Sequence, residues 1–283
     1  MAFSTLPLPR GEGLYAEPRM KGRVLIIAGS DSGGGAGIQA DIKTVTALDG
    51  YAETAVSALT AQNTRGVFGV IPVPPDFIAQ QMRVVLEDIG ADAVKTGMLH
   101  SAAVIDTVAA VLAELAPRVP LVIDPVIAAK DGTRLLDIDA VAALKRNLMV
   151  GAAVLVPNIP EAEALSGMSI RDVDDMRHAA STLLTLGPDA VLLKGGHLDN
   201  ETVIDVLATA DGIEMFEGSW IESKHTHGTG CTLASAIATG LAQGLDVPTA
   251  VQRGRLYVRR AIETAPGYGH GHGPLNHAHP LES

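Results

Sequence analysis

Hydrophobic residues in this chain fall in short continuous runs, separated by longer segments in which apolar positions recur at helical spacing. Short continuous runs are typical of strands buried on both faces of a sheet. Strands that alternate with helices predict right-handed crossovers and a mostly parallel sheet covered on both faces. The predicted strands are Arg23–Ala28, Ala52–Leu59, Val67–Val73, Ala93–Lys95, Leu121–Ile123, Ala153–Val156 and Ala190–Leu193. The predicted helices between them are Ile38–Val45, Asp76–Ile89, Ala102–Leu115, Ala140–Leu148 and Val173–Leu186.

The pattern changes after Gly195. Two strand-like runs, Val203–Leu207 and Ile213–Glu217, are split by a turn and predict an antiparallel hairpin at a sheet edge. Two helices, Thr232–Ala242 and Pro248–Thr264, follow. No linker or internal repeat divides the chain, so we expect one α/β domain over residues 22–283. Residues 1–21 are expected to be a disordered arm, or to precede a true start at Met20.

Composition and charge exclude several classes of protein. Hydrophobic residues make up 47% of the 283 residues and charged residues 19%, which is typical of a soluble globular protein. A net charge of −11 argues against a general nucleic-acid binder. No apolar run is long enough to span a bilayer. A single cysteine cannot form an internal disulfide, so we expect a cytoplasmic protein.

One glycine-rich stretch is a candidate anion site. It reads Thr226-His227-Gly228-Thr229-Gly230-Cys231 and leads directly into a predicted helix. The free N–H groups and the dipole at a helix N-terminus together bind anions such as phosphate. The same position predicts a lowered pKa for Cys231. The alternative is a turn that caps a buried helix, with the cysteine as a small core residue.

A second glycine-rich loop, Gly29–Gly37, follows the first strand and precedes a helix. Residues 35–40 fit a loose dinucleotide-binding pattern, but no acidic residue lies about 20 positions on, around Ser57 to Thr60, to bind the ribose. Residues 37–44 resemble a P-loop, except that Ile42 occupies the position of the second glycine. Neither motif is complete.

Ligands of open α/β sheets bind beyond the carboxyl ends of the strands. The polar and small residues predicted there are Gly29, Asp31, Gln62, Asn63, Met98, Asp124, Asn158, Glu161 and Lys194. Two of them, Asp124 and Glu161, are carboxylates at neighbouring strand ends, where they could hold a hydrated Mg²⁺ ion. Each residue taken alone could instead be a helix cap or a solvated loop charge.

The chain resembles the hydroxymethylpyrimidine/phosphomethylpyrimidine kinases of thiamine biosynthesis, which belong to the ribokinase-like superfamily. The resemblance covers nearly all of the chain after Lys21, in the order of the family's motifs. The matching segments are Ala28–Thr44, Ala61–Thr64, Lys95–Leu99, Pro157–Glu163, Lys194–His197 and Thr226–Thr232. It implies a three-layer α/β/α sandwich and the transfer of phosphoryl groups from ATP to a hydroxymethylpyrimidine and then to its monophosphate.

The resemblance also implies roles for residues. The catalytic anion hole would comprise Gly228, Gly230 and Cys231, where sugar kinases of the superfamily carry an aspartate in place of the cysteine. The residues expected to bind the pyrimidine are Gly29, Asp41, Gln62, Met98 and Val126. Lys194, Thr226 and Asn158 are expected to bind ATP or its phosphates, and Asp124 and Glu161 the magnesium ion. A homodimer is expected from the family.

Some positions depart from the family. Gln62 is an amide where some members carry glutamate, and Asp49–Ala52 replaces a more usual small run. The histidine-rich tail after Gly269 looks like a metal tract, but the family has a similar terminal loop. Three rival functions stay open: a pyridoxal kinase, a nicotinamide oxidoreductase, and a pyrimidine-binding sensor without phosphoryl transfer.

Overall fold

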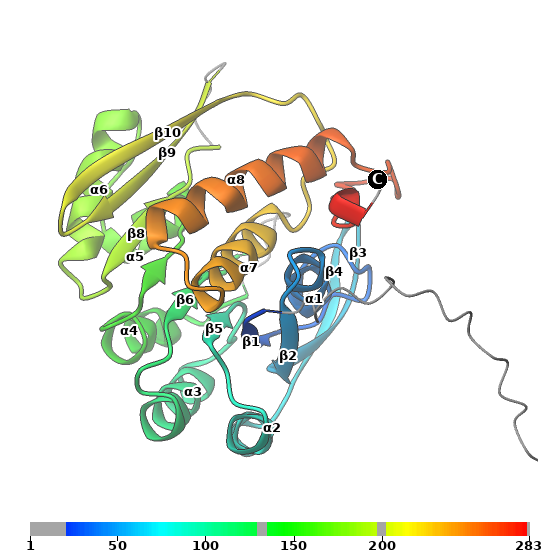
Figure 1. Cartoon of the computed structure of the whole chain (residues 1–283), viewed down its shortest axis with the longest axis vertical. Helices are drawn as coiled ribbons and strands as arrows, with labels where there is room; N and C mark the ends of the chain where they lie inside the picture. The colour runs from blue at the N-terminus through cyan, green and yellow to red at the C-terminus, as the bar shows by residue number, and fades with distance from the viewer. Residues whose placement is uncertain (1–20, 129–134, 197–201, 282–283) are drawn as a thin grey trace, which may run out of the picture.

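The computed structural model describes residues 21–128, 135–196 and 202–281. At its centre is an eight-stranded sheet in the order β10-β9-β8-β7-β6-β5-β1-β2 (Figure 1). The strands of this sheet are β1 (Arg23–Ala28), β2 (Tyr51–Val56), β5 (Ala93–Thr96), β6 (Leu121–Ile123), β7 (Val154–Leu155), β8 (Ala190–Leu193), β9 (Thr202–Thr209) and β10 (Gly212–Ser219). All pairings are parallel except β8 with β9 and β9 with β10. The predicted mostly parallel sheet with antiparallel edge strands is confirmed.

Helices cover both faces of the sheet, which confirms a three-layer α/β/α sandwich (Figure 1). One layer contains α1 (Gly37–Ala47), α7 (Thr229–Ala242) and α8 (Val247–Glu263). The other contains α2 (Pro75–Asp88), α3 (Ala102–Leu115), α4 (Ile138–Asn147), α5 (Ile159–Ser166) and α6 (Val173–Leu184). A short 3₁₀ helix, η1 (His279–Leu281), follows near the carboxyl end. No helix within the described ranges has the length and apolar character needed to cross a membrane.

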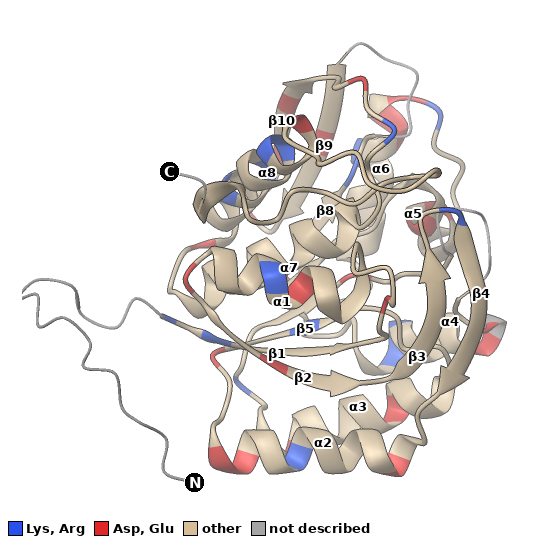
Figure 2. Ribbon diagram, turned by 90° about the vertical axis from the view of Figure 1, so that its right-hand side faces the viewer, with Lys and Arg blue, Asp and Glu red and all other residues tan. Residues whose placement is uncertain are grey.

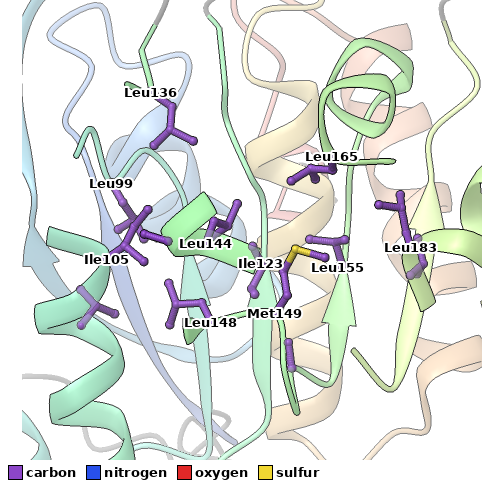
Figure 3. Packing of buried hydrophobic residues seen from close by; sticks show 14 of the residues in the cluster. Leu99, Ile105, Ile123, Leu136, Leu144, Leu148, Met149, Leu155, Leu165 and Leu183 are labelled. Atoms are coloured by element: carbon purple, nitrogen blue, oxygen red, sulfur yellow. The ribbon is translucent and has the colours of Figure 1, made fainter. Parts of the chain in front are cut away.

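Strand β1 explains why the apolar runs are continuous. Leu25 and Ile27 pack into the core beneath α2 to α6, whereas Val24 and Ile26 pack into the core beneath α1, α7 and α8. All four side chains have no exposed surface, because β1 lies between β2 and β5 and has helices on both sides. Figure 3 shows the first core, in which leucine, isoleucine and methionine side chains from helices and strands interdigitate.

The prediction of one strand over Ala52–Leu59 is wrong. The chain leaves the main sheet at Ser57, and β3 (Ala58–Asn63) forms a separate antiparallel pair with β4 (Gly66–Pro72). Figure 2 shows this hairpin apart from the main sheet. The Ser57 hydroxyl donates a hydrogen bond of 2.5 Å to the carbonyl oxygen of Met98, which fixes the point of departure.

Helix α5 was not predicted, although the sequence contains its start signal. Asn158 caps the helix by accepting a hydrogen bond of 2.9 Å from the Glu161 N–H, and the Glu161 carboxylate accepts one of 2.8 Å from the Asn158 N–H. This reciprocal pair is a capping box. A proline also lies in the first turn, where its missing N–H costs nothing.

One buried carboxylate lies far from the carboxyl ends of the strands. Glu53 in β2 is 5% exposed, and neither of its carboxylate oxygens has a hydrogen-bond partner. Burial raises its pKa from 4.5 to about 7, although Arg23 opposes the shift. The folded protein therefore holds a proton on Glu53 at a pH at which the unfolded chain does not.

This proton predicts an unusual dependence of stability on pH. Because the folded pKa lies above the unfolded one, Glu53 favours folding below pH 4.5, and this contribution is lost as the pH rises through about 7. We expect Glu53→Gln to raise the free energy of unfolding at pH 8 by roughly 1–3 kcal/mol and to leave it nearly unchanged at pH 5. Urea unfolding of both proteins at the two pH values measures the difference.

Glu217→Gln is the matched control, because Glu217 is also a strand glutamate but is exposed on β10. It should leave the pH dependence as in the wild type. An equal stabilisation by Glu53→Gln at pH 5 and pH 8 would contradict a protonated Glu53.

Candidate active site

The glycine-rich stretch predicted to bind an anion lies at the start of α7. Gly228 is the N-cap residue, with a φ of 85° that favours glycine. Because the first N–H groups of a helix have no partner within it, those of Gly230 and Cys231 are available to an anion, whereas the N–H of Thr229 donates to the carbonyl oxygen of Thr226 at 3.4 Å. The backbone here lies directly against the first glycine loop: a Cβ atom on Gly228 would overlap the carbonyl oxygen of Gly35.

A single carboxylate organises the first glycine loop. Asp31 is 1% exposed and accepts hydrogen bonds of 2.8–2.9 Å from the N–H groups of Gly33, Gly35 and Ala36. The same carboxylate lies 2.9 Å from Nε2 of His227, which belongs to the anion loop. Burial alone would raise the pKa of Asp31, but His227 and these N–H groups outweigh it, and the net shift is downward. An ionised Asp31 therefore joins the two glycine-rich loops.

Three residues predicted to bind the pyrimidine lie around these loops. Gly29 and Met98 are in contact, since a Cβ on Gly29 would overlap the methionine methyl group. Gln62 lies at the end of β3, and its amide nitrogen is 3.4 Å from Nε2 of His227. Ser32 exchanges two hydrogen bonds of 2.8 Å with the backbone of Gln62, so β3 is attached to the glycine loop.

Val126 was also expected to bind the pyrimidine. It is half-buried and has a φ of 32°, which a β-branched residue rarely adopts. It follows Asp124 in the loop after β6, at the carboxyl edge of the sheet where the other predicted site residues lie.

The two predicted metal ligands lie together with a lysine. Asp124 and Glu161 are 3% and 6% exposed, and Nζ of Lys194 is 3.4 Å from Oδ1 of Asp124. Burial raises the pKa of Glu161, with Asp124 adding to the shift and Lys194 opposing it. A Cβ on Gly230 would be 3.1 Å from Nζ of Lys194 and 3.6 Å from Oδ1 of Asp124. The start of α7 therefore faces this cluster.

This cluster fits magnesium only as part of a larger set of ligands. Mg²⁺ in phosphate-transfer sites is commonly held by one or two carboxylates together with phosphate oxygens and water. Among the described residues, no group of three or more His, Cys, Asp or Glu side chains could hold a metal ion. Asp124 and Glu161 thus suit an ion that arrives with a nucleotide, and Lys194 suits its phosphates.

The two remaining predicted phosphate residues flank these groups. Asn158 is the capping residue of α5 and forms a parallel bridge with Lys194. Thr226 is the first residue of the anion loop, and its carbonyl oxygen accepts a hydrogen bond of 2.7 Å from the hydroxyl of Thr229. Of the matching segment Lys194–His197, the histidine lies outside the described residues.

The prediction of a lowered pKa for Cys231 is wrong. Burial raises the pKa of its thiol to about 12; Lys95 opposes the shift, Asp124 and Asp41 add to it, and the N–H of Gly37 opposes it. Cys231 is therefore a neutral thiol at neutral pH, able to donate a weak hydrogen bond.

Asp41 was also predicted to contact the pyrimidine, and the structure places its side chain in the interior. Asp41 has no exposed surface, and Nζ of Lys95 lies 2.9 and 3.0 Å from its two carboxylate oxygens. The hydroxyl of Ser235 donates a further hydrogen bond of 2.7 Å to Oδ1. A carboxylate enclosed in this way has no surface to offer a ligand.

Sequence reasoning gave no role to several residues that shape the site. His227 was part of a motif, and its link to Asp31 required two loops 196 positions apart to meet. Lys95 was placed in an apolar strand, where a lone charge in a buried run signals a buried partner. Ser235 follows Cys231 by one helical turn, and this spacing could have predicted that both side chains lie on the same face of α7.

Comparisons with known proteins show the family to which the chain is similar. A family model described as phosphomethylpyrimidine kinase matches residues 31–276. The thiamine biosynthesis bifunctional protein ThiED of Geobacter sulfurreducens is 52% identical over 260 residues, and the match covers 92% of this chain and 53% of that protein. This chain therefore spans about half the length of that relative. The hydroxymethylpyrimidine/phosphomethylpyrimidine kinase of Streptomyces coelicolor is 45% identical, with 90% and 93% of the two chains covered.

A solved structure gives the same fold. The ADP complex of Bacillus subtilis pyridoxal kinase has a TM-score of 0.84 and 34% identity, and the match covers 93% of this chain and all of that chain. The fold is ribokinase-like, as the sequence resemblance implied.

Because the backbones of the two glycine loops are in contact, we expect one methyl group added at Gly228 to lower the activity strongly. We expect Gly228→Ala to lower kcat by about 10²-fold or more, the usual scale for losing one preorganised N–H donor. The added Cβ would overlap the carbonyl oxygen of Gly35 and displace the start of α7. Steady-state kinetics of the purified variant measures the loss.

Gly244→Ala is a close control. Gly244 has the same φ of 85°, but a Cβ there would meet nothing within 4 Å. It should carry the same backbone strain and keep wild-type kcat. Equal losses in the two variants would mean that strain, rather than contact with Gly35, causes the effect.

Proposed function

Since the chain belongs to the phosphomethylpyrimidine kinase family, we propose that it transfers the γ-phosphoryl group of ATP to 4-amino-5-hydroxymethyl-2-methylpyrimidine and then a second phosphoryl group onto the monophosphate, in thiamine biosynthesis. One observation carries this proposal. The N-terminus of α7 faces Asp124 and Lys194, and it packs on the glycine loop that leads to Gly29 and Gln62. A phosphate site and a ring site therefore share one wall.

The proposed mechanism relies on position and charge. Phosphoryl transfer passes through a loose transition state that needs alignment and neutralisation more than covalent help. The N–H groups at Gly230 and Cys231 stabilise the transferring group, and Lys194 binds the phosphates of ATP. Magnesium, held by Asp124 and Glu161, would neutralise phosphate charge. Gly29 and Met98 enclose the ring, and the Gln62 amide can pair with ring nitrogens or the exocyclic amine.

Cys231 acts in this proposal as a positioning group. A thiol with a raised pKa carries no negative charge to repel the phosphates, and its S–H can donate to the acceptor oxygen. It is a poor candidate for general base at neutral pH, because it holds its own proton. Proton loss from the hydroxymethyl group then accompanies or follows transfer.

A second candidate is pyridoxal kinase activity in the same site. The similarity in fold to a pyridoxal kinase favours it, and pyridoxal is also a ring that carries a hydroxymethyl group. The nicotinamide and sensor alternatives have less support, because no acidic residue follows the first glycine loop at the ribose-binding distance and because Asp124 and Lys194 lie together at the start of α7.

We also propose a homodimer in the cytoplasm. Family resemblance supports the dimer, and the single cysteine supports a reducing compartment. Light scattering that gives the mass of one chain would contradict the dimer, and recovery of the native protein from a compartment outside the cytoplasm would contradict the location.

The reaction itself is tested by a phosphorus NMR time course with the hydroxymethylpyrimidine, ATP and magnesium. We expect a monophosphate signal followed by a diphosphate signal. A reaction with EDTA in place of magnesium should give neither product. Turnover of pyridoxal without turnover of the pyrimidine would replace the first assignment by the second, and no turnover of either would reject a kinase.

Two substitutions test the role of Cys231. We expect Cys231→Ala to lose about 10²-fold or more in kcat, because a contact to the reacting group disappears. Cys231→Ser should retain more activity, because its hydroxyl still donates. ATP binding, followed by calorimetry, should survive in both. Near-wild-type turnover of Cys231→Ala would reject a role in positioning and in proton transfer alike.

A further inference from the structure

A fully buried ion pair lies behind the anion loop. Lys95, Asp41 and Ser235 all have no exposed surface. They come from three different elements, β5, α1 and α7. Strand β5 leads to Met98, α1 follows the first glycine loop, and α7 begins in the anion loop. The Lys95 ammonium contacts both carboxylate oxygens of Asp41 at 2.9–3.0 Å, and Ser235 donates to one of them. The three side chains therefore join the elements around the site.

Structural support alone does not explain why these groups are charged. Burial of two charges removes their hydration, and a well-packed apolar set of similar volume often stabilises a protein as much or more. The charge of Lys95 also acts on residues outside the pair. Lys95 interacts electrostatically with Cys231 and Asp124 as well as with Asp41, so its charge is felt in the site.

The ammonium stays charged in this position. Burial alone would lower the pKa of Lys95, but Asp41, Cys231 and Asp124 together outweigh it, and the net shift is upward. Lys194 differs from Lys95 in its exposure, because its side chain is 13% exposed beside Asp124 whereas Lys95 has no exposed surface. The start of α7 thus lies between Lys194, which is partly exposed, and Lys95, which is fully buried.

We propose that Lys95 is a positioning residue for phosphoryl transfer, whose buried ammonium, paired with Asp41, fixes the N-terminal half of α7 through the hydrogen bond from Ser235 to Asp41 and supplies a permanent positive charge behind the anion hole. The proposal rests on the proposed function. Lys95 touches no substrate. It acts through Cys231 and the N–H groups of the same turn, and it adds positive potential that needs no reorganisation during the reaction.

A double substitution distinguishes this role from a purely structural one. Lys95→Met alone leaves a buried unpaired carboxylate, and Asp41→Asn alone leaves a buried unpaired ammonium, so each single variant is expected to lose stability. The double variant Lys95→Met/Asp41→Asn removes both charges and keeps similar volumes. Lys95→Gln/Asp41→Asn, whose amides can bond to each other, is a second neutral pair should the first not fold.

The measurements are urea unfolding, kcat, and KM for both substrates. The acceptor is whichever one, pyrimidine or pyridoxal, the wild-type protein phosphorylates, so an inactive wild type rejects the proposed function and not the role of Lys95. We expect a neutral double variant to unfold at a urea concentration near that of the wild type. Its kcat should fall about 10-fold or more, while both KM values change less than about threefold, because the lost charge acts on the transition state.

The ion pair between Arg23 and Asp92 provides a matched control. It joins the starts of β1 and β5, at the opposite end of the strand that carries Lys95, with an N–O distance of 2.6 Å. Arg23→Met/Asp92→Asn should change stability and leave kcat unchanged. A folded neutral Lys95–Asp41 variant with kcat within twofold of the wild type overturns the proposal. A variant in which KM rises and kcat does not change also overturns the proposal.

Discussion

The candidate site depends on the approach of one loop backbone to another. The carbonyl of Gly35 lies where a side chain on Gly228 would be, and Asp31 holds the first loop in shape through three N–H groups. The same carboxylate reaches His227 of the second loop. Neither loop has the regular hydrogen bonds of a helix or sheet, so the buried charge of Asp31 replaces them. Because this contact brings the start of α7 beside the ring site, both halves of the proposed reaction depend on it.

The site contains two lysine–carboxylate pairs. Lys194 and Asp124 have side chains that are 13% and 3% exposed, and Lys95 and Asp41 lie behind them with no exposed surface. The protein is strongly acidic as a whole, with a net charge of −11, so long-range attraction does not bring a polyphosphate to it. In the proposed site, binding comes from Lys194 and from the N–H groups of α7. The proposed magnesium ion would offset the two outer carboxylates, which otherwise repel phosphate.

Much of the fold could be predicted because local patterns and tertiary packing agree. Continuous apolar runs such as Arg23–Ala28 became central strands, and helical spacing gave the helices of both layers. The prediction failed where an apolar run crossed a boundary that only tertiary contacts define. The chain turns away at Ser57 because its hydroxyl meets the carbonyl of Met98, a residue 41 positions away. In the site, the strand-end rule found Asp124, Glu161 and Lys194, whereas Lys95 and Ser235 are defined by contacts between elements distant in sequence.

Cys231 shows why a local rule can give the wrong sign. A cysteine in the first turn of a helix interacts favourably with the dipole as a thiolate, and that effect falls off within one turn and is modest. Here burial is the largest effect on the pKa of the thiol, and two carboxylates, Asp124 and Asp41, add to it. Desolvation of a whole charge outweighs half a unit of dipole charge. The outcome suits the proposed chemistry, because a neutral thiol occupies the anion hole without competing with phosphate for its N–H groups.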